Sequence, residues 1–196
     1  FAKGRLNGKT TIWATPEEKQ SEKFYKDGKL DGPSTNWVNG YRTTMTNYKL
    51  DNPDGPWAIW YPKSDQIKEK GYHQIGIKEG LTTYYYKDGT MQREGFLKQG
   101  SPNGIWTYWN SKGEKDFEFD FGENLEHIIL NQLVERESIF YKPGEDQPFT
   151  GVITDENADA GYLFLGRTNK GKKDGPWIKW SPSGKKVPEI LLVDVP

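Results

Sequence analysis

The sequence predicts an all-β protein: an elongated single-layer antiparallel sheet of tandem β-hairpin repeats, each of about 24 residues. Three observations predict this fold. Glycines that follow Asp, Asn or Glu recur at a nearly constant spacing, and an aromatic ring stands at a fixed distance after each of them. The segments between turn signals are short and rich in Trp, Tyr, Thr and Ile, as strands are.

The spacing of the glycines is the strongest of these signals. The six glycines that define the repeat are Gly8, Gly32, Gly55, Gly80, Gly104 and Gly175. The first five follow one another at the interval of one repeat unit, and the gap from Gly104 to Gly175 is close to three such units. Gly151 lies one unit before Gly175 and is therefore in phase, whereas a unit over residues 122–137 is expected from phase alone.

Aromatic residues stand at two fixed positions after these glycines. Five residues on, the chain has Trp13, Trp37, Trp60, Tyr85, Trp109 and Trp180. Two residues on, it has Trp57, Trp106 and Trp177 in three units and Thr10, Ser34 and Thr82 in the others. Because side chains alternate along a strand, residues three apart point to opposite faces, so both faces of the sheet are expected to carry rings.

Turn signals divide each unit into two strands. Asp-Gly and Asn-Gly favour the positive φ angles of hairpin turns, so the repeat glycines are expected at turns. A second turn follows eight to nine residues later, at Asn39-Gly40, Asp88-Gly89, Lys112-Gly113 and Ser183-Gly184. Each unit is then two strands of about six residues and two turns, and its rings are buried only against the neighbouring units.

The domain organisation follows from where the repeat is regular. We expect one repeat array over residues 1–196, with regular repeats in 1–121, a degenerate or irregular segment in 122–150 and C-terminal repeats in 151–196. Within the irregular segment, the apolar residues between Leu125 and Val134 have a spacing that fits either a short helix or an irregular strand.

Composition excludes several classes of function. The 27 basic and 28 acidic residues are interspersed, with none of the basic stripe that a nucleic-acid-binding protein shows. The chain has no cysteine, which excludes disulfides and thiolate chemistry, and no apolar run long enough to cross a membrane. Because the chain also begins at Phe1, we expect a secreted, periplasmic or cell-envelope location, with a cytoplasmic one as the alternative.

Three segments resemble the MORN repeat, in the variant found in bacterial proteins of the YwqK antitoxin-like type. They are Asp54–Tyr61, Asn103–Trp109 and Asp174–Trp180, and residues 140–144 with 149–152 resemble another form of the repeat. The resemblance covers nearly the whole chain except residues 122–137. It implies a β-hairpin array and a role in protein interaction or scaffolding, including the antitoxin-like role of the bacterial variants.

Two sets of rings are candidates for binding. The rings five residues after each glycine recur in every unit and are expected to pack between hairpins. The position two residues after the glycine varies between Trp and Thr or Ser, so Trp57, Trp106 and Trp177 are the candidate binding residues.

No residue set predicts catalysis or a cofactor. Residues 115–121 alternate between charged and aromatic side chains, which predicts a strand with Asp116, Glu118 and Asp120 on one face. We interpret that face as solvated, although three carboxylates together could attract a cation, and we expect no metal site. His73 and His127 lie far apart in the sequence, without a nearby nucleophile.

The sequence therefore predicts a non-catalytic protein that needs no cofactor and whose partner is another protein. The alternative is the binding of a carbohydrate or cell-envelope glycan through exposed Trp and Tyr rings. An enzyme that uses carboxylates on one sheet face is the third possibility, and neither nucleic acid nor a transmembrane segment is expected.

Overall fold

The computed structural model describes residues 4–157, 161–180 and 186–187, and the chain divides into two compact units, Phe1–Asp120 and Phe121–Pro196. Among the described residues, no helix has the length and the apolar character that a membrane crossing would require.

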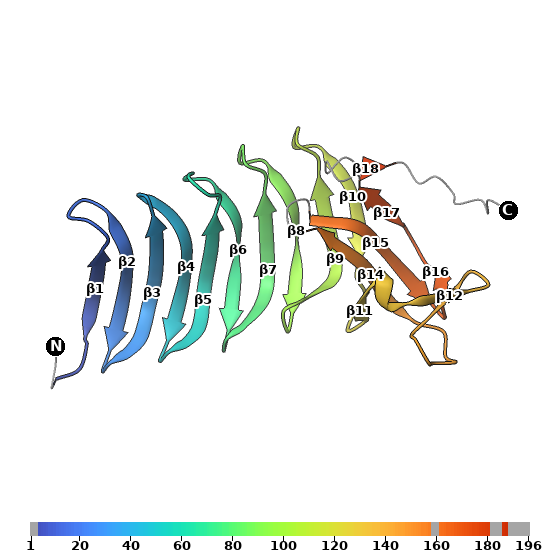
Figure 1. The fold of residues 1–196 in the computed structure, drawn as a ribbon, viewed down its shortest axis with the longest axis horizontal. Helices are drawn as coiled ribbons and strands as arrows, with labels where there is room; N and C mark the ends of the chain where they lie inside the picture. The colour runs from blue at the N-terminus through green and yellow to red at the C-terminus, as the bar shows by residue number, and fades with distance from the viewer. Residues whose placement is uncertain (1–3, 158–160, 181–185, 188–196) are drawn as a thin grey trace. The chain divides into compact units, whose positions relative to one another are not determined.

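The first unit is one antiparallel sheet of ten strands in chain order, which Figure 1 shows side by side. Every strand pairs with the strands before and after it in the sequence, so the sheet is a row of consecutive hairpins. The predicted fold class is therefore confirmed. The strands are β1 Gly8–Trp13, β2 Lys19–Lys26, β3 Lys29–Val38, β4 Tyr41–Lys49, β5 Asn52–Trp60, β6 Ile67–Gln74, β7 Ile77–Tyr85, β8 Met91–Lys98, β9 Ser101–Trp109 and β10 Lys115–Asp120.

In the first unit the repeat glycines lie within strands, so their prediction as hairpin turns is wrong there, whereas Gly175 lies at a bend. Gly32 and Gly55 have φ angles of 116° and 113°, and the register with the preceding strand shifts by two residues opposite each of them. Each is thus part of a β-bulge that bends the hairpin. The turn itself comes earlier in the chain, for example at Asp27 and Gly28. Both positions need a positive φ, so sequence composition does not distinguish them.

The second turns are confirmed where the structure describes them. Turns occupy Asn39-Gly40 and the segments around Gly89 and Gly113. Residues 181–185, which include the predicted turn at Ser183-Gly184, lie outside the described residues. In the first unit, where the bulge lies within a strand, most strands have eight to ten residues, longer than the six expected.

Hydrogen bonds join successive hairpins at both ends. At one end the backbone N–H of a turn residue donates to a carbonyl of the preceding hairpin, as from Gly28 to Leu6 at 2.8 Å and from Gly100 to Lys78 at 2.9 Å. At the other end the Tyr61 hydroxyl donates to the carbonyl of Tyr85 at 2.7 Å, one unit further on. These hydrogen bonds hold each hairpin next to the hairpin that follows it.

The second unit contains a six-stranded sheet, a two-stranded sheet and a short 3-10 helix. Its elements are β11 Glu126–Ile129, η1 Leu130–Gln132, β12 Val134–Arg136, β13 Ile139–Tyr141, β14 Gly151–Asn157, β15 Gly161–Asn169, β16 Lys172–Lys173, β17 Ile178–Trp180 and β18 Lys186–Val187. The pair β11–β14 is parallel, unlike the antiparallel pairing predicted, because the chain returns between them through η1 and the β12–β13 hairpin.

The segment between Leu125 and Val134 contains both of the structures left open by its sequence. A strand and the 3-10 helix follow one another there, and Ile128, Leu130 and Leu133 pack against the core of this unit. That core is formed by the buried residues Phe140, Phe149, Ile153 and Trp177.

Candidate functional site: a hollow on the second face of the sheet

The first face of the ten-stranded sheet carries a packed row of side chains from neighbouring strands. The row runs through Trp57, Gly71, Thr82, Gly95, Trp106 and Phe119. Three small residues separate the two indoles in this row, and each indole lies over a glycine. A Cβ atom added to Gly95 would come within 2.3 Å of the Trp106 ring. Large and small residues are therefore matched along this face.

The three candidate binding tryptophans are all buried. Trp57, Trp106 and Trp177 have exposed fractions of 3%, 2% and 8%. The position two residues after the glycine is therefore a buried one in all three of these units. The physical reason is the glycine on the adjacent strand, which lets the indole lie flat against the sheet. The choice of these residues as binding residues stays a prediction.

The rings five residues after the glycines lie on the opposite, second face. Basic side chains stand between them: the Lys19 ammonium lies 5.8 Å from the ring centre of Trp13 and 5.5 Å from that of Trp37. The Arg42 guanidinium lies 5.2 Å from the ring of Trp60. The rings thus form a ladder with cations, although Trp13 at its end is 50% exposed. The Trp180 side chain lies outside the described residues.

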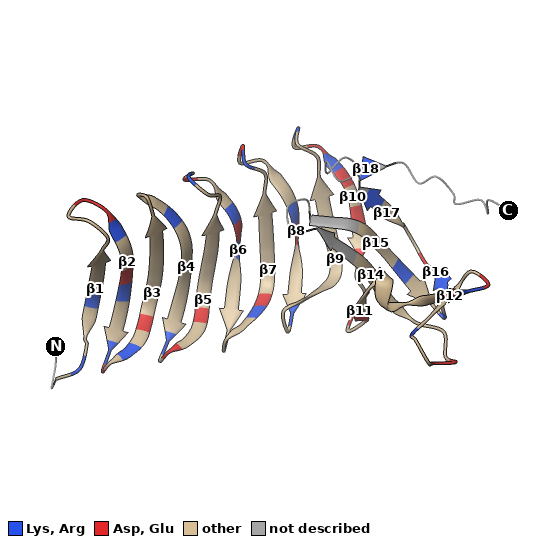
Figure 2. Ribbon diagram, viewed as in Figure 1, with Lys and Arg blue, Asp and Glu red and all other residues tan. Residues whose placement is uncertain are grey.

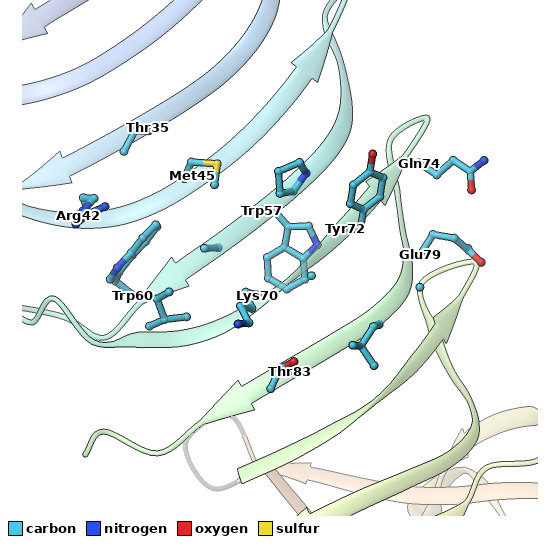
Figure 3. A pocket seen from close by; sticks show the side chains of 16 residues that line it. Thr35, Arg42, Met45, Trp57, Trp60, Lys70, Tyr72, Gln74, Glu79 and Thr83 are labelled. Atoms are coloured by element: carbon cyan, nitrogen blue, oxygen red, sulfur yellow. The ribbon is translucent and has the colours of Figure 1, made fainter. Parts of the chain in front are cut away.

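A hollow of about 780 Å³ opens on the second face (Figure 3). Its lining is mainly apolar, with basic groups from β4 and β6 and an acidic one from β7. The lining residues central to its chemistry are Arg42, Met45, Ala58, Trp60, Lys70, Tyr72, Glu79 and Leu81. All of them belong to the first unit.

The hollow lies where the repeat departs from its own pattern. On the second face, threonine three residues after the glycine stands opposite glutamate in three hairpins, as in Thr83 with Glu94, whose side chains are hydrogen bonded at 2.9 Å. In the pair formed by β5 and β6, Ala58 stands opposite Lys70 instead. The small side chain leaves space, and the lysine reverses the charge.

Exposed apolar side chains continue from the hollow across β6 to β9. Tyr72, Leu81, Phe96 and Ile105 point to the second face and are 50%, 48%, 57% and 60% exposed. Leu81 and Phe96 are direct partners across two strands. We call these four residues the exposed apolar row. Neighbouring strands lie about 4.8 Å apart, so the row is a continuous surface.

The charges of the sheet are mixed in sign, as Figure 2 shows. Arg42 and Lys70 both line the hollow, and neither makes an ion pair with another described residue. Glu79 also lines it, and its carboxylate accepts the backbone N–H of Gln99 at 2.8 Å. The hollow therefore combines an apolar body with two unpaired cations.

Of the candidate cation-binding carboxylates, Glu118 and Asp120 alternate with the phenylalanines as predicted, whereas Asp116 lies at a β-bulge that interrupts the alternation. In β10 the aromatic side chains of Phe117 and Phe119 alternate with more exposed acidic ones. Glu118 accepts a hydrogen bond from Lys115 at 2.7 Å, which lowers the pKa of its carboxyl. Within the described part of the chain, no group of three or more His, Asp or Glu side chains could hold a metal ion.

The two histidines lie in different units, and the pKa of each is lowered. Burial lowers the pKa of His73, and the nearby charge of Lys78 lowers it further. Burial alone lowers the pKa of His127, whose ring stacks on Phe121 at 5.6 Å. Both are therefore neutral at neutral pH, and neither lines the hollow.

Sequence reasoning missed the residues that define the hollow, above all Arg42, Met45, Ala58 and Lys70. A signal for them exists in the sequence: a comparison of the units shows that Ala58 replaces threonine and that Lys70 replaces glutamate. These two replacements can be related to each other only when the strand register is known, because the register shows that Ala58 and Lys70 are partners across β5 and β6.

Comparison with known proteins gives no family assignment. No protein-family model matches the sequence, and no curated protein matches it significantly.

Proposed function

We propose that the chain is a non-catalytic MORN-type repeat protein that binds a segment of another protein across the second face of its ten-stranded sheet. It would serve as an interaction or scaffold module, and a toxin is one such partner that the resemblance to the antitoxin-like class implies. The observation that carries this proposal is the exposed apolar row beside the hollow.

An apolar surface of this kind favours a protein partner for a physical reason. Apolar area exposed over several neighbouring strands gains free energy when a partner removes it from water. Aromatic residues such as Tyr72 are also enriched at the centres of protein interfaces.

Glycan binding is the alternative, and the exposed rings of Trp13 and Tyr72 are what favour it. A sugar stacks on the open face of a ring, but cations lie near the rings of Trp37 and Trp60. The ring ladder is therefore less suited to sugars than its regular spacing suggests.

Selection of peptides from a random phage-displayed library against the full chain tests the proposal. We expect peptides that bind the chain and lose about tenfold in affinity on Leu81→Ser or Phe96→Ser, because truncating central apolar contacts costs about that much. Val38→Ser is the matched control, since Val38 is 59% exposed but lies outside the row.

Two outcomes would contradict the proposal. One is that the selected peptides bind the Leu81 and Phe96 variants as tightly as the unchanged chain. The other is that no peptide is enriched while a glycan array yields a ligand, which would establish the alternative.

A further inference from the structure

The first unit contains five successive two-stranded hairpins: β1–β2, β3–β4, β5–β6, β7–β8 and β9–β10. The second strand of each hairpin has two positions, three residues apart, whose side chains lie on the second face of the sheet, where the hollow opens. The two positions are occupied by Lys19 and Glu22, Arg42 and Met45, Ile67 and Lys70, Met91 and Glu94, and Lys115 and Glu118. The strand register is the same in each case. The first position pairs with the ring five residues after the glycine, and the second pairs with the residue two positions before that ring.

In the first and last of these pairs the sheet supplies its own carboxylate. Lys19 makes an ion pair with Glu22 at 3.2 Å, and Lys115 makes one with Glu118 at 2.7 Å. Arg42 occupies the same position as these lysines, but the residue three further on is Met45. The internal counter-charge of the repeat is therefore missing beside Arg42.

In the next hairpin the charge at the second position is reversed. Lys70 stands where the repeat has glutamate in three other hairpins. Its ammonium lies 5.3 Å from the ring centre of Tyr85, and it forms no ion pair with any residue that the structure describes. The two departures fall on adjacent hairpins and line the same hollow.

We infer that the protein segment bound in this hollow carries a carboxylate, from an Asp or Glu side chain flanked by apolar side chains, and that Arg42 and Lys70 bind it. The partner's carboxylate replaces the one that the repeat provides in its other hairpins. Trp60, Met45 and Ala58 contact the apolar flanks and exclude water, which strengthens the charge pairing. This inference rests on the proposed function and adds the chemistry of the partner.

A charge-swap experiment tests it with the peptides selected on the full chain. We expect acidic residues between apolar ones to be enriched among them, and Lys70→Glu to weaken binding by about tenfold, as expected for the loss of a charge-assisted contact. A peptide in which the acidic residue is changed to Lys should bind the Lys70→Glu chain better than the unchanged chain. Such a rescue does not arise from a merely structural role of Lys70.

The matched control is Lys112→Glu, which makes the same charge change at an exposed turn of the first unit outside the hollow. Binding should also weaken with added salt, because exposed charge pairs are screened.

The outcomes separate this inference from the proposed function. Two results would contradict the inferred carboxylate even if Leu81→Ser still weakens binding. One is that the selected peptides are neutral or basic, and the other is that Lys70→Glu and Lys112→Glu change the binding affinity equally. If Leu81→Ser has no effect either, or no peptide is selected, both proposals fail.

Discussion

At the scale of single residues, one arrangement of tryptophan and glycine recurs in both units. The Trp106 indole N–H donates to the carbonyl of Phe96 at 3.1 Å, and the Trp177 indole N–H donates to the carbonyl of Arg167 at 3.0 Å. Each acceptor directly follows the glycine under the ring, Gly95 or Gly166. Trp57 lies over Gly71, but its buried N–H has no partner among the described residues.

The substitution Gly95→Ala tests this arrangement, because the new Cβ atom would overlap the Trp106 ring. We expect a loss of about 2 kcal/mol in the free energy of unfolding, the usual effect of overpacking. Urea unfolding measures it. Trp106→Leu should remove most of the penalty of Gly95→Ala in the double variant, and additive losses would contradict the contact.

Acid should destabilise the chain through its two histidines. Their pKa values are lowered in the folded chain, so the unfolded chain takes up protons first as the pH falls below about 6.5. The free energy of unfolding should therefore decrease between about pH 7 and about pH 5. His73→Gln and His127→Gln should each reduce that decrease in urea unfolding, whereas an unchanged slope in both variants would contradict it.

At the scale of elements, each hairpin is held by its neighbours at both ends. The tyrosine bond repeats from one unit to the next: Tyr61 donates to the carbonyl of Tyr85, and Tyr86 donates to that of Trp109 at 2.9 Å. Burial raises the pKa of both phenols, so they remain protonated donors at neutral pH. The same hydroxyl position therefore sets the distance between successive hairpins.

Removing either hydroxyl should weaken the array. Tyr61→Phe and Tyr86→Phe should each lower the free energy of unfolding by about 1 kcal/mol, the net contribution of one hydrogen bond. Tyr25→Phe is the control, since the Tyr25 hydroxyl makes no hydrogen bond with the described residues. Chemical denaturation compares the three, and equal losses would show that the inter-unit bonds contribute nothing particular.

At the scale of the whole molecule, the chain consists of two units with separate sheets. In the first unit every strand pairs only with its sequence neighbours, so its stability is a sum over neighbouring hairpins. The hollow and the exposed apolar row belong entirely to this unit. The surface proposed to bind a partner thus depends on local contacts.

A chain that ends after Asp120 should therefore keep its ten-stranded sheet. We expect a β-type far-UV circular dichroism spectrum and a cooperative thermal transition, because the pairing of all ten strands lies within residues 8–120. The comparison is a fragment that ends after Tyr85, which keeps the exposed apolar row only as far as Leu81. We expect its melting temperature to be lower than that of the fragment that ends after Asp120. An unfolded 1–120 fragment would contradict the independence of the first unit.

The repeat spacing was sufficient to predict the ten-stranded hairpin array, because the aromatic and glycine positions are local features that recur along the chain. It also placed Trp57 and Trp60 on opposite faces, since side chains alternate along a strand. It did not predict which ring position is buried. That depends on Gly71 and Gly95, which lie on the adjacent strands.

The sequence by itself determined the fold class, the period of the repeat and the absence of cysteine chemistry, because these follow from residue types and their spacing. The tertiary structure alone decided which glycine bends a strand and which forms a turn, since both need a positive φ and only the strand pairing separates them. It also decided where the hollow lies. Ala58 and Lys70 are well separated in the sequence and become neighbours only when β5 and β6 pair.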